Sequence, residues 1–104
     1  MKIYATKRVT KGLSDNGNKD FLDSFQKAMQ VITKSANDNT LNSDLKIQKL
    51  NISEQPIFSF RIDKLTRLIF TITIDENNEI ALTLLDIARH ADNIEAFVSG
   101  STRN

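Results

Sequence analysis

The chain has 104 residues, the length of one domain, and 39% of them are hydrophobic, which is typical of a globular protein. It has no cysteine, which excludes disulfides, thiolate metal sites and a cysteine nucleophile. Its net charge of +1 is weak for a nucleic-acid binder. Because no apolar run approaches the about 18 residues of a membrane span, and the basic N-terminus lacks the apolar run of a signal peptide, we expect one cytoplasmic domain, 1–104, with no membrane contact.

The N-terminal segment is basic and combines a short strand with an ambiguous stretch. Residues 1–12 carry no acid and four cations, Lys2, Lys7, Arg8 and Lys11. Met1–Thr6 alternates around Ile3, which predicts a short strand. Val9–Asp15 fits either a helical turn or a loop. A basic front of this kind can steer a polyanion to one face, although an ordinary solvated surface explains it as well.

One long amphipathic helix follows. Its apolar residues recur at helical spacing, at Phe21, Leu22, Phe25, Ala28, Met29 and Ile32. This predicts a helix from about Lys19 to Ala36, with Asn18 or Asp20 as its cap. The next segment, Leu41–Leu50, fits a short helix or an extended lead-in.

Three strands are predicted in the second half of the chain. Ile57–Asp63 alternates, with Phe58, Phe60 and Ile62 on one face and Arg61 on the other. In Thr66–Asp75, Leu68, Phe70, Ile72 and Ile74 share one face, and Arg67, Ile69, Thr71 and Thr73 share the other. A turn containing Asn77 and Asn78 leads to the third strand, Ile80–Ile87.

The third strand is apolar on both sides, which predicts a central place in the sheet. We expect Leu82, Leu84 and Asp86 on one face, with Leu85 and Ile87 on the other. A short helix is expected at Ala91–Val98. The predicted fold is α+β: a small antiparallel, mixed-edge sheet of about four strands, with helices packed on one face.

Most catalytic motifs are missing from the sequence. The single histidine and its acidic neighbours have no recognised metal-ligand spacing, so we expect no metal and no cofactor. A Ser-His-Asp triad remains possible by composition, but no Gly-x-Ser-x-Gly elbow is present. Three scattered glycines cannot build a phosphate loop.

A cationic face is the remaining candidate site. Arg61 and Arg67 have the same parity on adjacent strands, while Arg89 and His90 follow the third strand. Guanidinium groups bind phosphate bidentately, and a histidine can move a proton near neutral pH. Such a set suits cleavage of an RNA phosphodiester by the substrate's own 2′-hydroxyl, without a metal. The alternative for each arginine is a salt bridge, for example with Asp63 or Glu79.

The motifs FSFRID, TRLIF, IALTLLDI and RHADNIEAF, in this order, resemble the C-terminal half of the RelE/ParE toxins of bacterial toxin–antitoxin pairs. The likeness covers most of residues 18–98. It implies a RelE-like fold, an mRNA endoribonuclease that inhibits translation and causes growth arrest, and a cognate antitoxin as partner. The resemblance implies that the target is mRNA, which members of the family often cut on the ribosome.

The resemblance also assigns residues. Arg61, Arg67, Arg89 and His90 match the basic positions of the family. Some relatives have a tyrosine near the C-terminus, where this chain has Glu95, a candidate base. We further expect the lysines Lys46, Lys49 and Lys64 to contact RNA. Because part of the superfamily poisons DNA gyrase, a gyrase-directed toxin or an inactive binding protein of the same fold is the alternative, and an unrelated α+β domain a third.

Overall fold

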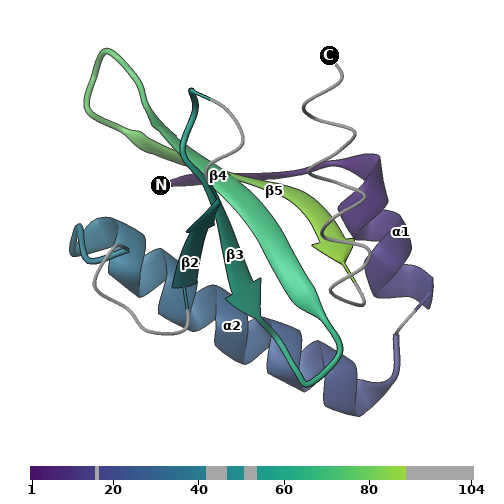
Figure 1. Cartoon of the computed structure of the whole chain (residues 1–104). Helices are drawn as coiled ribbons and strands as arrows, with labels where there is room; N and C mark the ends of the chain where they lie inside the picture. Colours follow the sequence, from purple (N-terminus) through teal and green to yellow (C-terminus); the bar gives the residue numbers. More distant parts are fainter. Residues whose placement is uncertain (16, 42–46, 51–53, 89–104) are drawn as a thin grey trace.

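The computed structural model describes residues 1–15, 17–41, 47–50 and 54–88 (Figure 1). Within them lie, in chain order, β1 (Lys2–Ala5), α1 (Lys7–Asp15), α2 (Lys19–Asn37), β2 (Ile47–Leu50), β3 (Ile57–Arg61), β4 (Arg67–Ile74) and β5 (Ile80–Ala88). The strands form one sheet in the order β1-β5-β4-β3-β2. β1 runs parallel to β5, and the other neighbours are antiparallel. No helix in this part of the chain is both long and apolar enough to cross a membrane.

The expected α+β fold is confirmed, and the structure shows which alternative holds for the two segments that the sequence left ambiguous. The stretch that fitted a turn or a loop forms the helix α1, and the segment before Asn51 ends in the extended β2. The sheet therefore has five strands within the described residues, one more than the about four expected. The C-terminal helix expected at Ala91–Val98 lies outside the described residues.

The helix α2 begins and ends as its sequence predicts. The side-chain Oδ1 of Asn18 accepts a hydrogen bond from the Phe21 N–H at 2.8 Å, which satisfies one of the free donors of the first turn. Asp20 lies in the first turn and Lys34 in the last, where each complements the helix dipole. Just after the helix, Asn39 adopts a positive φ of 56°, a conformation that asparagine tolerates well.

Both helices pack on one face of the sheet, which we call the helix face. α1 contributes Val9 to this core, and α2 contributes Ala28 and Ile32. The strands contribute Ile47, Phe58, Phe60, Leu68, Phe70, Leu82 and Leu84. Figure 1 shows α2 crossing the lower part of the sheet on this side, and α1 beside β5. The opposite face carries Ser59, Arg61, Arg67, Ile69 and Thr71, and we call it the arginine face.

The expected alternation of β5 is wrong after Leu84. Leu84 lies opposite Phe70, but Asp86 lies opposite Ile69 and Ile87 opposite Leu68, so one extra residue interrupts the ladder. This irregularity is a β-bulge, and it reverses the two faces of the strand beyond it. Ile87 therefore joins the helix face, where a Cβ added to Gly12 of α1 would lie 3.2 Å from its Cδ1 atom. Asp86 moves to the arginine face.

Two leucines that flank one turn should differ sharply in their effect on stability. Leu68 is fully buried, whereas Leu65 is 53% exposed. We expect Leu68→Ala to lower the free energy of unfolding by about 3 kcal/mol, because it removes buried methyl groups and leaves a cavity. Leu65→Ala should change it by less than about 0.5 kcal/mol. Chemical denaturation of both variants checks this, and equal losses would contradict the described packing.

Candidate functional site

Arg61 and Arg67 meet across the β3–β4 hairpin. Arg61 is the last residue of β3, Arg67 is the first of β4, and they are direct cross-strand partners. The turn between them is closed by hydrogen bonds from the N–H groups of Ile62 and Asp63 to the Thr66 carbonyl, at 2.9 and 3.3 Å. Directly opposite residues project from the same side of a sheet, with Cβ atoms about 5 Å apart. The hairpin thus brings two arginine residues to one end of the arginine face.

Neither arginine forms the salt bridge considered as its alternative role. The Arg61 Nε donates to the backbone carbonyl of Asp63 at 3.3 Å, while the Asp63 carboxylate accepts from the Leu65 N–H. Glu79 lies 3.9 Å from the Lys2 ammonium. Within the described residues, no carboxylate lies within ion-pair distance of Arg61 or Arg67. As far as the described residues go, their remaining N–H donors have no carboxylate partner and could bind an anion.

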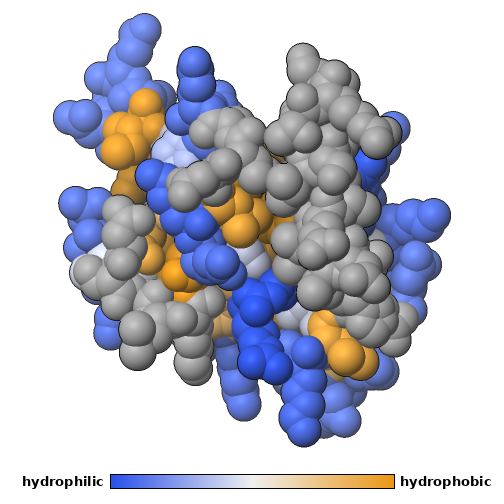
Figure 2. Space-filling view, in the orientation of Figure 1, coloured by the Kyte–Doolittle hydropathy of each residue, from blue (hydrophilic) through white to orange (hydrophobic). Residues whose placement is uncertain are grey.

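The centre of the arginine face is apolar and buried. Ile69 and Ser59 are direct cross-strand partners and both are fully buried. Within the described part of the chain, the Ser59 hydroxyl has no hydrogen-bond partner, whereas the Thr71 hydroxyl donates to the Pro56 carbonyl at 2.6 Å. Figure 2 shows the side of the molecule turned away from α2, where orange apolar side chains at the centre are bordered by blue hydrophilic ones.

An ion pair links this face to the helix α1. An Asp86 carboxylate oxygen lies 3.5 Å from Nη1 of Arg8, and the other accepts the Ile87 N–H at 2.8 Å. Because β1 ends at Ala5, opposite Leu84, β5 continues past β1 beyond that point. Arg8 reaches Asp86 there, from the first turn of α1. No local sequence pattern predicts this contact, since it depends on the bulge in β5.

The other predicted site residues divide into two groups. Lys64 is exposed in the turn between the two arginines, and Lys49 is exposed on β2. Lys46, Arg89, His90 and Glu95 lie outside the described residues. Arg89 nevertheless follows Ala88 in sequence, and Ala88 is the cross-strand partner of Arg67. Over the described residues, no three His, Asp or Glu side chains gather in a way that could hold a metal ion.

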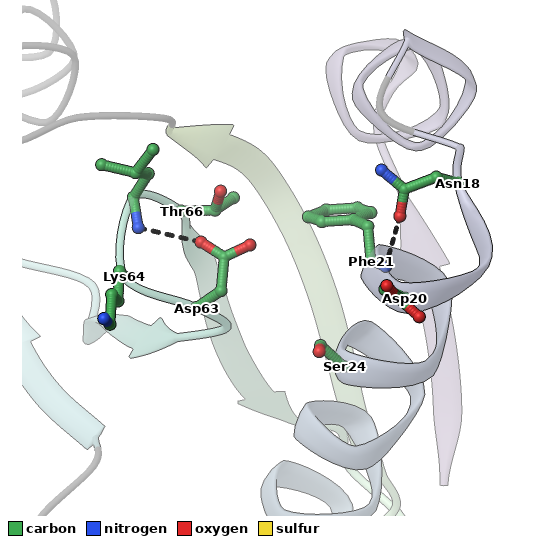
Figure 3. A pocket seen from close by; sticks show the side chains of 8 residues that line it. Asn18, Asp20, Phe21, Ser24, Asp63, Lys64 and Thr66 are labelled. Atoms are coloured by element: carbon green, nitrogen blue, oxygen red, sulfur yellow. Dashed lines mark hydrogen bonds between the residues drawn. The ribbon is translucent and has the colours of Figure 1, made fainter.

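Two cavities flank the hairpin on the side of α2. The first, of about 440 Å³, lies between the start of α2 and the β3–β4 turn, as Figure 3 shows. Its labelled residues include Asp20 and Ser24 on the helix and Asp63 and Lys64 on the turn. The second, of about 400 Å³, also contacts Ser24 and is lined by Lys27, Ala28, Val31, Phe60, Arg61 and Ile62. Arg61 therefore belongs both to the arginine pair and to the wall of a largely apolar groove.

The comparison with known proteins supports the fold. No protein-family model matches the sequence, and none of the curated proteins is similar enough to match it. Among solved structures, a YoeB/ParE toxin from Agrobacterium tumefaciens superposes with a TM-score of 0.62. The match covers 86% of this chain and 99% of that chain, at 15% sequence identity. At this identity the likeness shows the fold, and the RelE/ParE-like architecture expected from the sequence is confirmed.

The arginine pair should cost folding stability. Like charges directly opposite on a sheet destabilise it by about 0.2–1 kcal/mol, so Arg67→Gln should raise the free energy of unfolding at low salt. The gain should shrink at high salt, which screens the repulsion. Arg8→Gln is the control: it removes an attractive contact with Asp86 and should give no gain. Urea denaturation at two salt concentrations measures this, and a loss of stability in Arg67→Gln would indicate an attractive partner for Arg67.

Proposed function

We propose that this chain, which has the fold of a YoeB/ParE toxin, is the toxin of a bacterial toxin–antitoxin pair and cleaves mRNA. The observation that supports this most is the placement of Arg61 directly opposite Arg67, with no carboxylate paired to either among the described residues. Unpaired cations repel each other in the folded state, so their juxtaposition favours an anionic ligand. The proposed place of action is the cytoplasm, where mRNA is found.

The proposed reaction is a transfer within the RNA strand. The 2′-oxygen of one ribose attacks the adjacent phosphorus, the bond from phosphorus to the 5′-oxygen breaks, and a 2′,3′-cyclic phosphate and a 5′-hydroxyl form. The phosphorane gains negative charge at its non-bridging oxygens, which the guanidinium groups of Arg61 and Arg67 stabilise. The 2′-hydroxyl proton passes to a base and another returns to the 5′-oxygen.

The groups that move these protons are proposed from the sequence. Glu95 is the candidate base, His90 is the candidate group that moves the other proton, and Arg89 is a third cation for the phosphate. Support comes from the end of β5, because Ala88 lies opposite Arg67 and the three residues follow it in the chain. Lys46 and Lys64 are proposed to hold the flanking strand. Lys49, also expected to contact RNA, is the cross-strand partner of Phe58 and therefore lies on the helix face of β2.

The proposed partner is an antitoxin whose segment covers the arginine pair. The groove beside Arg61 offers apolar contacts from Val31, Phe60 and Ile62, and Lys27 lies at its wall. A segment with apolar residues and a carboxylate for Arg61 suits this chemistry. A small acidic protein encoded next to this chain is the candidate, and co-expression should restore growth.

Expression from a tight promoter tests the nuclease proposal. We expect growth arrest with cut transcripts, and a loss of cleavage of about 10²–10³-fold in Arg67→Ala, since one donor to the charged intermediate is removed. Arg67→Lys keeps the charge but not the bidentate geometry, so it should recover only part of the rate. Lys34→Ala, an exposed cation at the end of α2, is the matched control and should cleave normally.

Two results would contradict the proposal. Arrest with DNA damage and intact mRNA would favour a gyrase-directed toxin. Cleavage that survives Arg67→Ala unchanged would remove the arginine pair from the mechanism.

A further inference from the structure

Tyr4 lies on the arginine face, although it is far from the arginines in sequence. β1 pairs in parallel with β5, so that Tyr4 is the partner of Thr83. Thr83 is in turn the partner of Thr71 on β4. Side chains alternate along a strand, so Thr71 and Arg67, four residues apart on β4, share one face. The bulge in β5 lies beyond Thr83 and does not interrupt this path.

The ring of Tyr4 is open to a ligand. It is 52% exposed, and its neighbour Ile3 is 51% exposed on the opposite face, where Ile3 pairs with Leu82. From ideal spacings, two strand separations and four residues place the Cα of Tyr4 about 16 Å from that of Arg67. A short single strand can contact both points, since comparable surfaces bind about 4–16 nucleotides.

Two cations accompany Tyr4 along the same edge. Lys2 is two residues away on the same strand, and its ammonium forms only a long 3.9 Å contact with Glu79. Arg8 holds Asp86 at 3.5 Å, and its side chain is 71% exposed. Asp86 is the cross-strand partner of Ile69, two residues from Arg67, so Arg8 lies between the tyrosine and the arginine pair. The basic N-terminal segment thus extends the cationic face beyond the hairpin.

We propose that Tyr4 stacks on an RNA base several nucleotides from the scissile phosphate, while Lys2 and Arg8 contact the phosphates between them. The choice of RNA rests on the proposed function. Aromatic side chains on a sheet surface stack on unpaired bases whatever their sequence, and basic side chains nearby hold the backbone. This assigns a role to the tyrosine and the N-terminal cations, which the cleavage mechanism does not use.

The tyrosine provides its own signal. Tyr4 is the single tyrosine of a chain without tryptophan, so the intrinsic emission of the protein comes from this side chain. The probe is a single-stranded 12-nucleotide RNA that is 2′-O-methylated throughout, which blocks the attacking oxygen and keeps the wild-type protein from cutting it. We expect saturable quenching of the tyrosine emission on titration with this RNA.

Variants separate stacking from folding. Tyr4→Ala should bind the same RNA about 5–150-fold more weakly, the range for one lost base stack. Tyr4→Phe keeps the ring and should bind within about 2-fold of wild type. Ile3→Ala is the matched control, equally exposed on the same strand but on the helix face, and should bind normally. Thermal unfolding of each variant confirms that it is folded.

The outcomes distinguish this inference from the proposed cleavage. RNA binding with unchanged tyrosine emission, and equal affinity for Tyr4→Ala, would overturn the stacking role while transcript cleavage in cells still stands. Absence of any binding to the RNA would overturn it as well. The wild-type emission could be quenched and Tyr4→Ala could bind more weakly, while the protein cuts no transcript. That result would uphold the stacking surface and reject the nuclease proposal. Quenching by a protein partner alone would make this edge a protein contact and refute the proposal.

Discussion

The packing of one side of β4 against the helices determines which side chains lie on its other side. Phe70 is fully buried and stacks on Phe58, with ring centroids 5.4 Å apart and an interplanar angle of 21°. Because side chains alternate with a period of two, a slip of one residue would move Phe70 to the arginine face and turn Arg67 into the core of the helix face. The packing against the helices therefore holds Arg67 on the opposite face. The same register places Arg61 of β3 on this face and, through the pairing of β5 with β1, Tyr4 as well.

The arginine face lowers the stability that this packing provides. Arg61 and Arg67 are direct cross-strand partners, and like charges at such positions are unfavourable unless an anion binds between them. Within the described residues, the buried Ser59 hydroxyl is also unpaired, two residues before Arg61. Sequences break such local rules chiefly at functional sites, where the loss is offset by the rest of the fold. Both features lie on the face opposite α1 and α2, which agrees with its proposed use in binding.

The sequence predicts the parts of this fold that have a regular period. α2 repeats its apolar residues every three or four positions, and every second residue of β3 and β4 is apolar on one face. The two faces of each element, and the shared face of Arg61 and Arg67, could therefore be predicted directly. The bulge in β5 could not be predicted. This strand is apolar on both sides, so one extra residue does not disturb any alternation of polar and apolar residues. β2 is only four residues long, and its pairing with β3 depends on tertiary contacts.

The candidate site was predictable to the same extent. The arginine pair follows from strand periodicity and a tight turn, both local properties. Tyr4 reaches the same face only through a parallel pairing between residues 79 positions apart, and the Arg8–Asp86 contact needs both that pairing and the bulge. Such long-range pairing has no local sequence signature. Arg89, His90 and Glu95 remain predictions from the resemblance.

The low net charge restricts how the proposed RNA site can work. With a net charge of +1, the whole protein exerts little long-range attraction on a polyanion. Each phosphate that a cation neutralises adds about 0.7 to the salt slope for a single strand, so a face with few cations gains modest affinity from counterion release. Short-range contacts must then supply the remainder, through bidentate guanidinium groups and a stacked ring. Those contacts require a fixed geometry, which a sheet anchored by a buried core provides. The positions of a few side chains on one face therefore carry more of the functional argument than the total charge does.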